Sequence, residues 1–241
     1  MLLKTSGIVF RTVKYGETSV ITDIFTEENG LHTFIAGNVR GARSRMPFGL
    51  FQPMTVVELI AYYREGADAL NRLKELRSGL VFSAIPFDIR RGAVTLFMAE
   101  ICRKSIRESE ENRPLFEFLL ENLRWLDTTP HPIANLHLHF LLHLAPFLGF
   151  QPQGEPDAGE TFFDLKEGVF NSEPPDHTYY LEPEVTQQVL QLLQISLEQS
   201  HEIQLNRSER KVLLNNLLRF YQFHVEGFTE INTPEILEMV L

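Results

Sequence analysis

Three arginines lie close together in the segment GNVRGARSR, residues 37–45. Arg40, Arg43 and Arg45 are separated only by small residues, so the backbone between them is loose enough to follow an extended ligand. The whole chain carries a formal net charge of -10 at pH 7, so its global attraction for a polyanion is weak. The cluster is therefore either a solvated surface loop or a local binding site for a negatively charged partner.

Two further cations and several aromatic residues belong to the same part of the chain. Arg11 and Lys14 lie on the first strand that the pattern predicts, where a barrel can present them together with the arginine loop. Exposed aromatic rings stack on unpaired bases while neighbouring cations contact phosphates. Most aromatic residues of this region must nevertheless fill the core, and the set comprises Tyr15, Phe34, Phe48, Phe51, Tyr62 and Tyr63.

Basic residues also cluster where the pattern predicts helices. One set comprises Arg90, Arg91, Arg103, Lys104 and Arg107. A second set stands at the start of a late helix and comprises Arg207, Arg210 and Lys211. Both sets flank apolar helix faces, so each is either ordinary helix surface or the rim of a groove that captures an acidic, apolar peptide.

The common enzyme signatures are absent from the sequence, which has no P-loop, no paired-glycine dinucleotide motif, no G-x-S-x-G elbow and no H-E-x-x-H motif. His139 and His143 are four residues apart, as metal ligands on one helix face are, but the residues around them are apolar and offer no third ligand. They are either partly buried histidines or the ligands of a metal-dependent hydrolase. The single cysteine, Cys102, lies in an apolar pattern typical of a buried thiol. We therefore expect no enzyme activity, metal or cofactor.

Alternation of polar and apolar residues predicts short strands in the first eighty residues. On the first strand, the alternation places Val9 and Arg11 on the same face. The Asn29-Gly30 pair is a strong hairpin signal because both residues adopt positive φ angles readily. The segment ALNRLKELRSG at 69–79 fits either a final strand or a short helix. Five strands without a helical repeat predict a small barrel of the OB type.

The period becomes helical from about residue 86 onward. Asp88 is a predicted N-cap, and Asn206 with Glu209 forms a predicted capping box at the start of a late helix. Residues 151–183 interrupt the helices with Pro, Gly and acidic residues, and the segment TFFDLKEGVF within them resembles a small hairpin.

Charge divides the chain into two parts. Residues 1–80 hold ten Lys and Arg against eight Asp and Glu, a balance of +2, whereas the remaining residues have a balance of -12. We predict an α+β protein with an OB-fold domain at 1–80 and a mostly helical domain at 81–241 that carries the hairpin. The sequence lacks a signal-peptide pattern and any apolar run long enough to span a membrane, which predicts a cytoplasmic protein without membrane contact.

Several motifs together resemble the bacterial RecO family of recombination mediators. They are YGETS, the FTEENG turn, the GNVRGARSR loop, the Leu-Gly-Phe-x-Pro close of a helix and the segment FYQFHVEGFTEI. The resemblance covers nearly the whole chain and implies an N-terminal OB fold and a helical C-terminal domain. It also implies binding to single- and double-stranded DNA, annealing of complementary strands, and no nucleotide hydrolysis. The implied partners are RecR and single-stranded-DNA-binding protein, with which the family lets RecA load on DNA.

The resemblance implies roles for the basic clusters. The family's DNA contacts include the basic OB-fold region, so Arg40, Arg43 and Arg45 look like phosphate ligands, with Arg11 and Lys14 beside them. The acidic tail of single-stranded-DNA-binding protein docks on the helical domain of the family. The candidates for that contact are Arg90, Arg91, Arg103, Lys104 and Arg107.

One departure from the family concerns the hairpin. Many members carry a four-cysteine zinc module there, but residues 151–183 contain no cysteine, so no zinc is expected. The hairpin is expected to be held instead by the packing of Phe162, Phe163, Leu165, Val169 and Phe170.

Three functions stay open at this point. The first is a non-enzymatic mediator that anneals DNA. The second is a metal-dependent hydrolase that uses His139 and His143. The third is a protein adaptor whose OB-fold domain has lost DNA binding, a function that the net charge of -10 keeps open.

Overall fold

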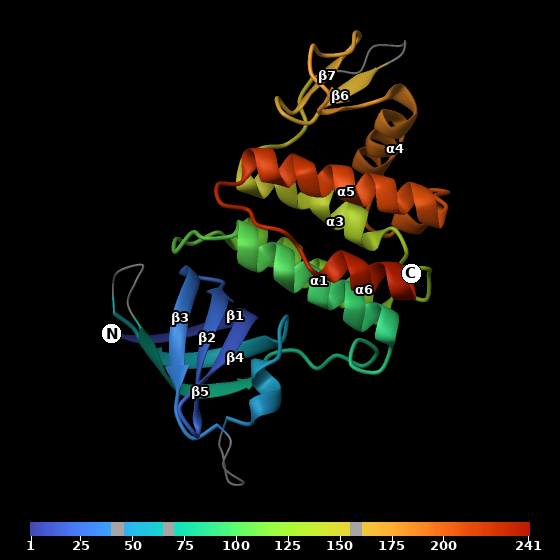
Figure 1. Ribbon diagram of the computed structural model, residues 1–241. Helices are drawn as coiled ribbons and strands as arrows, with labels where there is room; N and C mark the ends of the chain where they lie inside the picture. Colours follow the sequence, from blue (N-terminus) through green and yellow to red (C-terminus); the bar gives the residue numbers. More distant parts are fainter. Residues whose placement is uncertain (40–45, 65–69, 155–160) are drawn as a thin grey trace. The chain divides into compact units, whose positions relative to one another are not determined.

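The computed structural model describes residues 1–39, 46–64, 70–154 and 161–241 (Figure 1). The chain forms two compact units, Met1–Thr128 and Thr129–Leu241. The domain boundary predicted near residue 80 falls inside the first unit, between its strands and its first helix, and stays a prediction. In the described parts of the chain, no helix is long and apolar enough to cross a membrane.

In the first unit, the described strands form a closed barrel in the order β1-β2-β3-β5-β4. They are β1 (Leu2–Tyr15), β2 (Ser19–Thr26), β3 (Gly30–Ala36), β4 (Val56–Tyr62) and β5 (Asn71–Ser78), with a short 3-10 helix at Phe48–Phe51. Neighbouring strands pair antiparallel except β3 and β5, which pair in parallel. This order confirms the predicted OB-type barrel. The segment that fitted either a strand or a helix forms β5.

β1 changes its inward face halfway along its length. Val9 pairs with Ile24 and lies in the barrel core, whereas Arg11 pairs with Asp23 and is exposed. The cause is a β-bulge between Val9 and Arg11, which adds one residue and shifts the alternation by one position. The predicted alternation, which placed these two residues on one face, is therefore wrong here. The bulge is the reason that Arg11 lies on the surface.

The described part of the first unit also contains the helices α1 (Ile89–Ser105) and α2 (Arg113–Thr128). Asp88 caps α1, as predicted, because its side chain accepts hydrogen bonds from the backbone N–H groups of Arg90 and Arg91. The ring of Phe116 on α2 lies 6.3 Å from the ring of Phe25 on β2, between ring centroids. Contacts of this kind cover part of the outer barrel wall with apolar side chains.

Asp127 near the end of α2 fastens the segment that leads from the barrel to α1. Its carboxylate accepts hydrogen bonds of 2.8–2.9 Å from the backbone N–H groups of Ser83, Ala84 and Ile85, and one of 3.0 Å from the Ser83 hydroxyl. Burial by itself raises the pKa of Asp127, but these hydrogen bonds outweigh burial and lower the pKa overall. The carboxylate is therefore a charged structural anchor.

The β2–β3 turn requires glycine at position 30. Gly30 has a φ of 70°, and a Cβ there would lie 2.2 Å from the carbonyl oxygen of Glu110. Leu31 donates its backbone N–H to the carbonyl oxygen of Glu108 at 2.9 Å. The predicted hairpin at Asn29-Gly30 is confirmed, and it is packed against the connection between α1 and α2.

The described residues of the second unit form helices and a small sheet of order β7-β6-β8. The helices are α3 (Leu136–Leu144), α4 (Pro183–Gln194), α5 (Arg207–His224) and α6 (Thr233–Val240), with 3-10 turns at Ala145–Leu148 and Ser200–Glu202. The strands are β6 (Phe162–Asp164), β7 (Val169–Asn171) and β8 (Tyr180–Leu181). The predicted capping box of Asn206 and Glu209 is present at the start of α5. The sequence patterns did not predict β8 or α6.

The predicted hairpin in the excursion is formed by β6 and β7. Phe163 and Leu165 are buried, and the ring centroid of Phe163 lies 4.8 Å from that of Phe170 and 5.4 Å from that of Phe220 on α5. Phe162, Val169 and Phe170 are half-buried. Aromatic packing of this kind anchors the hairpin on α5.

Candidate nucleic-acid interface on the barrel

A row of outward-facing side chains follows the cross-strand pairs from strand to strand around the barrel. The cross-strand pairs of this row join Val13 to Ile21, Ile21 to Ile35, Ile35 to Arg72 and Arg72 to Tyr62. Arg72 is exposed, and Tyr62 is 54% exposed. The row is therefore an apolar strip with a cation and an accessible aromatic ring at one end.

Two more exposed cations lie beside this row, on strands that contribute to it. Arg11 precedes Val13 by two residues on β1, and Lys74 follows Arg72 by two on β5. In the part of the chain that the structure describes, Arg11, Arg72 and Lys74 form no ion pair with a carboxylate. We call this surface the cationic face, and it comprises Arg11, Val13, Ile21, Ile35, Tyr62, Arg72 and Lys74.

One acidic residue interrupts the cationic face. Asp23 lies directly opposite Arg11 in the β1–β2 pair. The hydroxyl group of Thr33 donates a hydrogen bond of 2.8 Å to its carboxylate. Because a carboxylate repels phosphate, Asp23 weakens the attraction of this end of the face for a polyanion.

The predicted arginine loop begins and ends at this barrel. Arg40, Arg43 and Arg45 lie outside the described residues, so their role stays a prediction. The residues that flank the loop, Val39 and Met46, belong to the barrel core.

The start of the loop and the end of β1 are joined through β2. Val39 donates its backbone N–H to the carbonyl oxygen of Thr18 at 2.8 Å. Lys14 is exposed and pairs across β1–β2 with Val20, which in turn pairs with Ala36 at the end of β3. Lys14 therefore lies at the same end of the barrel as Val39, the last described residue before the loop.

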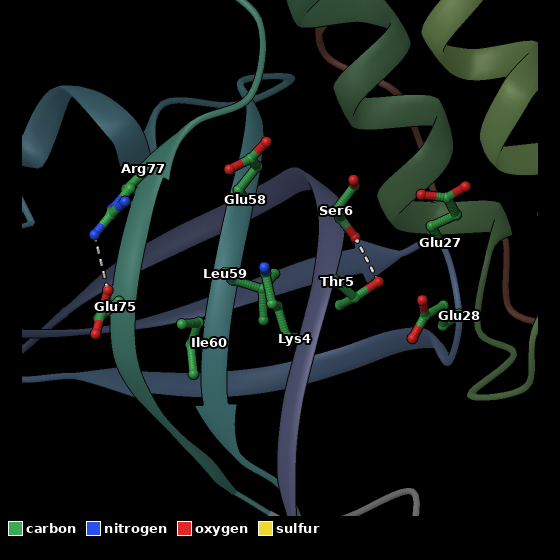
Figure 2. A pocket seen from close by; sticks show the side chains of 10 residues that line it. All are labelled: Lys4, Thr5, Ser6, Glu27, Glu28, Glu58, Leu59, Ile60, Glu75 and Arg77. Atoms are coloured by element: carbon green, nitrogen blue, oxygen red, sulfur yellow. Dashed lines mark hydrogen bonds and ion pairs between the residues drawn. The ribbon is translucent and has the colours of Figure 1, made fainter.

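A different part of the barrel surface carries an acidic pocket of about 390 Å³ (Figure 2). Its lining residues are Lys4, Thr5, Ser6, Glu27, Glu28, Glu58, Leu59, Ile60, Glu75 and Arg77. One of the two cations, Arg77, is paired with Glu75 at 3.2 Å. Four glutamates against two cations make this pocket repulsive for phosphate, so it is not the polyanion site of the barrel.

The structure does not bring together the five cations predicted to bind a peptide, of which four lie on α1 and Arg107 follows its end. Arg103 follows Arg90 by thirteen residues on the helix, which corresponds to about 20 Å along its axis. Arg91 is largely buried, pairs with Asp88 and donates a hydrogen bond to the backbone oxygen of Leu126. Its guanidinium group is used to join α1 to α2.

The other members of the set divide in the same way. Lys104 is largely buried and forms an ion pair of 3.4 Å with Glu100. Arg103 and Arg107 are exposed near the end of the helix, and Arg90 is exposed near its start beside Asp88. Arg90, Arg103 and Arg107 are therefore the members that a ligand can reach.

The histidine pair on α3 is used for structure. The rings of His139 and His143 stack with centroids 3.9 Å apart, and each Nε2 atom lies 3.1–3.2 Å from a backbone carbonyl oxygen, of Ile195 and Leu192 respectively. Burial lowers the pKa of His139 to about 4. In the described chain, no group of three or more His, Cys, Asp or Glu side chains is placed to hold a metal ion.

Cys102 also has a structural environment. The side chain is fully buried in α1, and burial raises the pKa of its thiol. A buried neutral thiol is a poor nucleophile.

Sequence reasoning missed two cations of the candidate site. Arg72 and Lys74 were visible as basic residues, but the segment that contains them fitted a strand or a helix equally well. Their position became evident only from the parallel pairing of β5 with β3, which puts Arg72 beside Ile35. The alternation of Arg72 and Lys74 with the buried Leu73 was the one available signal.

Comparison with known proteins gives matches to both parts of the chain. Residues 1–78 match the family model "Recombination protein O N terminal", and residues 86–230 match "Recombination protein O C terminal". The "DNA repair protein RecO" of Bacteroides fragilis is 36% identical over 239 residues, which cover 99% of this chain and 98% of that protein. The proteins of the same name from Phocaeicola vulgatus and Flavobacterium psychrophilum are 35% and 33% identical, and each covers at least 98% of both chains.

Proposed function

The chain belongs to the RecO family of DNA repair proteins, and on that premise we propose that it is a DNA repair and recombination mediator. In this proposal it binds single- and double-stranded DNA, anneals complementary strands and works without enzymatic turnover. Together with RecR, it helps RecA load on DNA coated by single-stranded-DNA-binding protein. The observation that carries the proposal is the cationic face, where exposed cations on β1 and β5 lie towards the two ends of an apolar strip on an OB-type barrel.

Strand binding is assigned to the cationic face together with Arg40, Arg43 and Arg45 of the arginine loop. Arg11, Arg72 and Lys74 contact phosphates, and the exposed ring of Tyr62 stacks on a base. The aliphatic side chains of Ile21 and Ile35 have no donors or acceptors with which to read a base edge. Binding on this surface is therefore blind to sequence.

Annealing follows from the same chemistry. Two complementary strands repel each other through their phosphates, so a protein that neutralises phosphates on both strands brings them together. Phosphate contacts carry no sequence information and leave the base edges available for pairing. The acidic pocket and the net charge of -10 confine DNA to the few basic surfaces.

We assign the acidic tail of single-stranded-DNA-binding protein to the exposed cations of α1 and of the segment that follows it. Arg90, Arg103 and Arg107 are the accessible members of the predicted set. Arg91 and Lys104 do not contact the tail in this assignment. The guanidinium group of Arg91 already donates to the backbone of α2, and Lys104 already forms an ion pair with Glu100.

The proposal is tested by fluorescence anisotropy of a labelled single-stranded oligonucleotide across a salt series. The triple variant Arg40→Ala/Arg43→Ala/Arg45→Ala should bind more weakly than the unmodified chain. Its plot of log K against log salt should be shallower by about 2, because each lost phosphate contact removes about 0.7 from the slope for single strands.

A charge-matched control keeps the result specific. The variant Arg77→Ala/Arg124→Ala/Lys166→Ala loses the same charge at exposed positions that belong neither to the loop nor to the cationic face, and it should bind like the unmodified chain. Identical curves for all three proteins would remove the loop from the site. Absence of binding by the unmodified chain would favour the adaptor function instead.

A further inference from the structure

The C-terminal helix α6 covers the basic first turns of α5. The Arg207 guanidinium donates a hydrogen bond to the backbone oxygen of Glu238, and that of Arg210 donates one of 3.0 Å to the backbone oxygen of Leu241. Lys211 Nζ lies 2.8 Å from the carboxylate of Glu238. All three cations that the sequence places at the start of this helix are thus bound to one short segment.

These contacts recognise the C-terminal end of a helix. The last carbonyl groups of a helix have no partner inside it and carry partial negative charge. The guanidinium groups of Arg207 and Arg210 donate hydrogen bonds to backbone oxygens at this end, and the ammonium group of Lys211 pairs with the acidic side chain. Leu237 is buried beside them and lines, together with Leu214 of α5, a residual cavity of about 20 Å³. The surface therefore fits a short helix with a large aliphatic residue next to an acid.

α6 is a short helix that is partly exposed to solvent. It is eight residues long, and helices of this length are unstable in isolation. Leu237 is its buried side chain, whereas Ile236 and Met239 are exposed. The side chains of its ion pair, Lys211 and Glu238, are 54% and 32% exposed, so water and salt compete for that contact.

The floor of this surface adds no negative charge. His137 of α3 is buried beneath α6 and lines the same residual cavity. Burial, and then the positive charge of Arg210, lower the pKa of His137 to about 3, so it is neutral at physiological pH. The charge that faces an occupant therefore comes from the three cations of α5.

We propose that this surface, which we call the α5 groove and define by Arg207, Arg210, Lys211 and Leu214, is a protein-docking site that α6 closes within the same chain. An acidic, leucine-bearing helical segment of a partner protein displaces α6 and binds there. Because residues 225–232 tether α6 to α5, α6 competes at a high effective concentration. The proposal does not depend on DNA binding by the barrel.

The test uses a labelled, C-terminally amidated peptide with the sequence NTPEILEMVL, residues 232–241 of this chain. Its binding is measured by fluorescence anisotropy to the unmodified chain and to the variant Leu237→Ala/Glu238→Gln, which weakens α6 and leaves the α5 groove untouched. The variant should bind the peptide at least about tenfold more tightly, because its own segment no longer competes. Equal binding by both proteins would overturn the proposal.

A charge exchange locates the binding site. Adding Lys211→Glu to the double variant should abolish binding of the original peptide and permit binding of a peptide in which Glu238 is replaced by Lys. Unchanged binding of the original peptide would exclude the α5 groove. If the variant forms dimers that shield the α5 groove from the peptide, the occupant of the groove is a second copy of this chain. That outcome would contradict our proposal that the occupant is a partner protein.

Hydrogen exchange tests the detachment of α6 in the unmodified chain, where no substitution disturbs folding. The backbone amides of Leu237 to Leu241 should exchange at least about a hundredfold faster than those of Leu214 to Leu218 inside α5. Equal protection of the two segments would show that α6 opens only when the whole unit unfolds, and the proposal would fail.

Discussion

The barrel and the helices use their charged side chains differently. On the barrel, Arg11, Arg72 and Lys74 are exposed and, among the described residues, form no ion pair. On the helices, Arg91 and Arg210 donate to backbone oxygens of neighbouring segments. The number of cations in a sequence cluster therefore does not give the charge that a ligand meets, because other groups of the folded chain can already bind those cations.

Asp127 is the clearest example of a charged group that is fully engaged within the folded chain. The substitution Asp127→Ala leaves several backbone N–H groups without their acceptor and should lower the free energy of unfolding by about 3 kcal/mol. Urea denaturation at pH 7 measures this loss. Asp127→Asn is the matched control and should lose less, because its amide oxygen still accepts hydrogen bonds. Equal stability of the Ala variant and the unmodified chain would contradict the assignment.

The pH dependence of this difference follows from the lowered pKa of Asp127. A carboxyl group with a lowered pKa in the folded state stabilises the protein fully above its unfolded pKa, which is about 3.9. The stabilisation is lost as the pH falls through the folded pKa. The difference between Asp127→Ala and the unmodified chain should therefore be constant from pH 7 to about pH 5 and narrow below about pH 4.

Removal of the barrel cations should weaken DNA binding and leave the free energy of unfolding nearly unchanged. The variant Arg11→Ala/Arg72→Ala/Lys74→Ala should bind single-stranded DNA roughly tenfold or more weakly at low salt, with a salt slope reduced by about 2. Its free energy of unfolding should change by less than about 0.5 kcal/mol, because exposed side chains without partners contribute little to stability. Anisotropy and urea denaturation on the same samples separate the two effects. A large loss of stability with unchanged DNA affinity would show that the barrel cations stabilise the fold and do not bind DNA.

Asp23 offers the smallest and finest test. Asp23→Asn removes a negative charge opposite Arg11 and keeps an oxygen that can accept the hydrogen bond from Thr33. DNA affinity should rise about two- to threefold at low salt, and the gain should disappear at high salt as screening increases. Glu58→Gln in the acidic pocket is the matched control at a residue that does not belong to the cationic face, and its effect should be smaller. An equal gain from both variants would mean that net charge, and not position, governs binding.

Local sequence patterns predicted much of the fold. Alternation and turn residues predicted the barrel, and Asp88 and Asn206 marked the starts of α1 and α5 because capping depends on neighbours within one turn. The same patterns failed where distant segments decide. The bulge that turns Arg11 outward depends on the pairing with β2, and the identity of β5 depends on β3 and β4.

The candidate site was predicted only in part for the same reason. Arg11 and Lys14 were chosen from the sequence and are exposed, whereas Arg72 and Lys74 were not chosen. The engagement of the α5 cations was invisible, because Arg207 finds its partner 31 residues further along the chain in a helix too short to produce a clear periodic pattern. Spacing identifies charged residues, but only packing shows which of them are already bound.

The bulge in β1 also limits how the length of this strand can vary. Residues before the bulge face the core at odd positions, such as Val9, and those after it at even positions, such as Thr12, whose hydroxyl donates to the buried Thr22. Deletion of Phe10, the extra residue of the bulge, would restore plain alternation and keep Arg11 opposite Asp23, but it would remove a buried ring that stacks on Phe25. Deletion of one residue elsewhere in the strand would turn the residues on one side of the deletion to the opposite face of the sheet. The strand therefore tolerates changes of residue type better than changes of residue number.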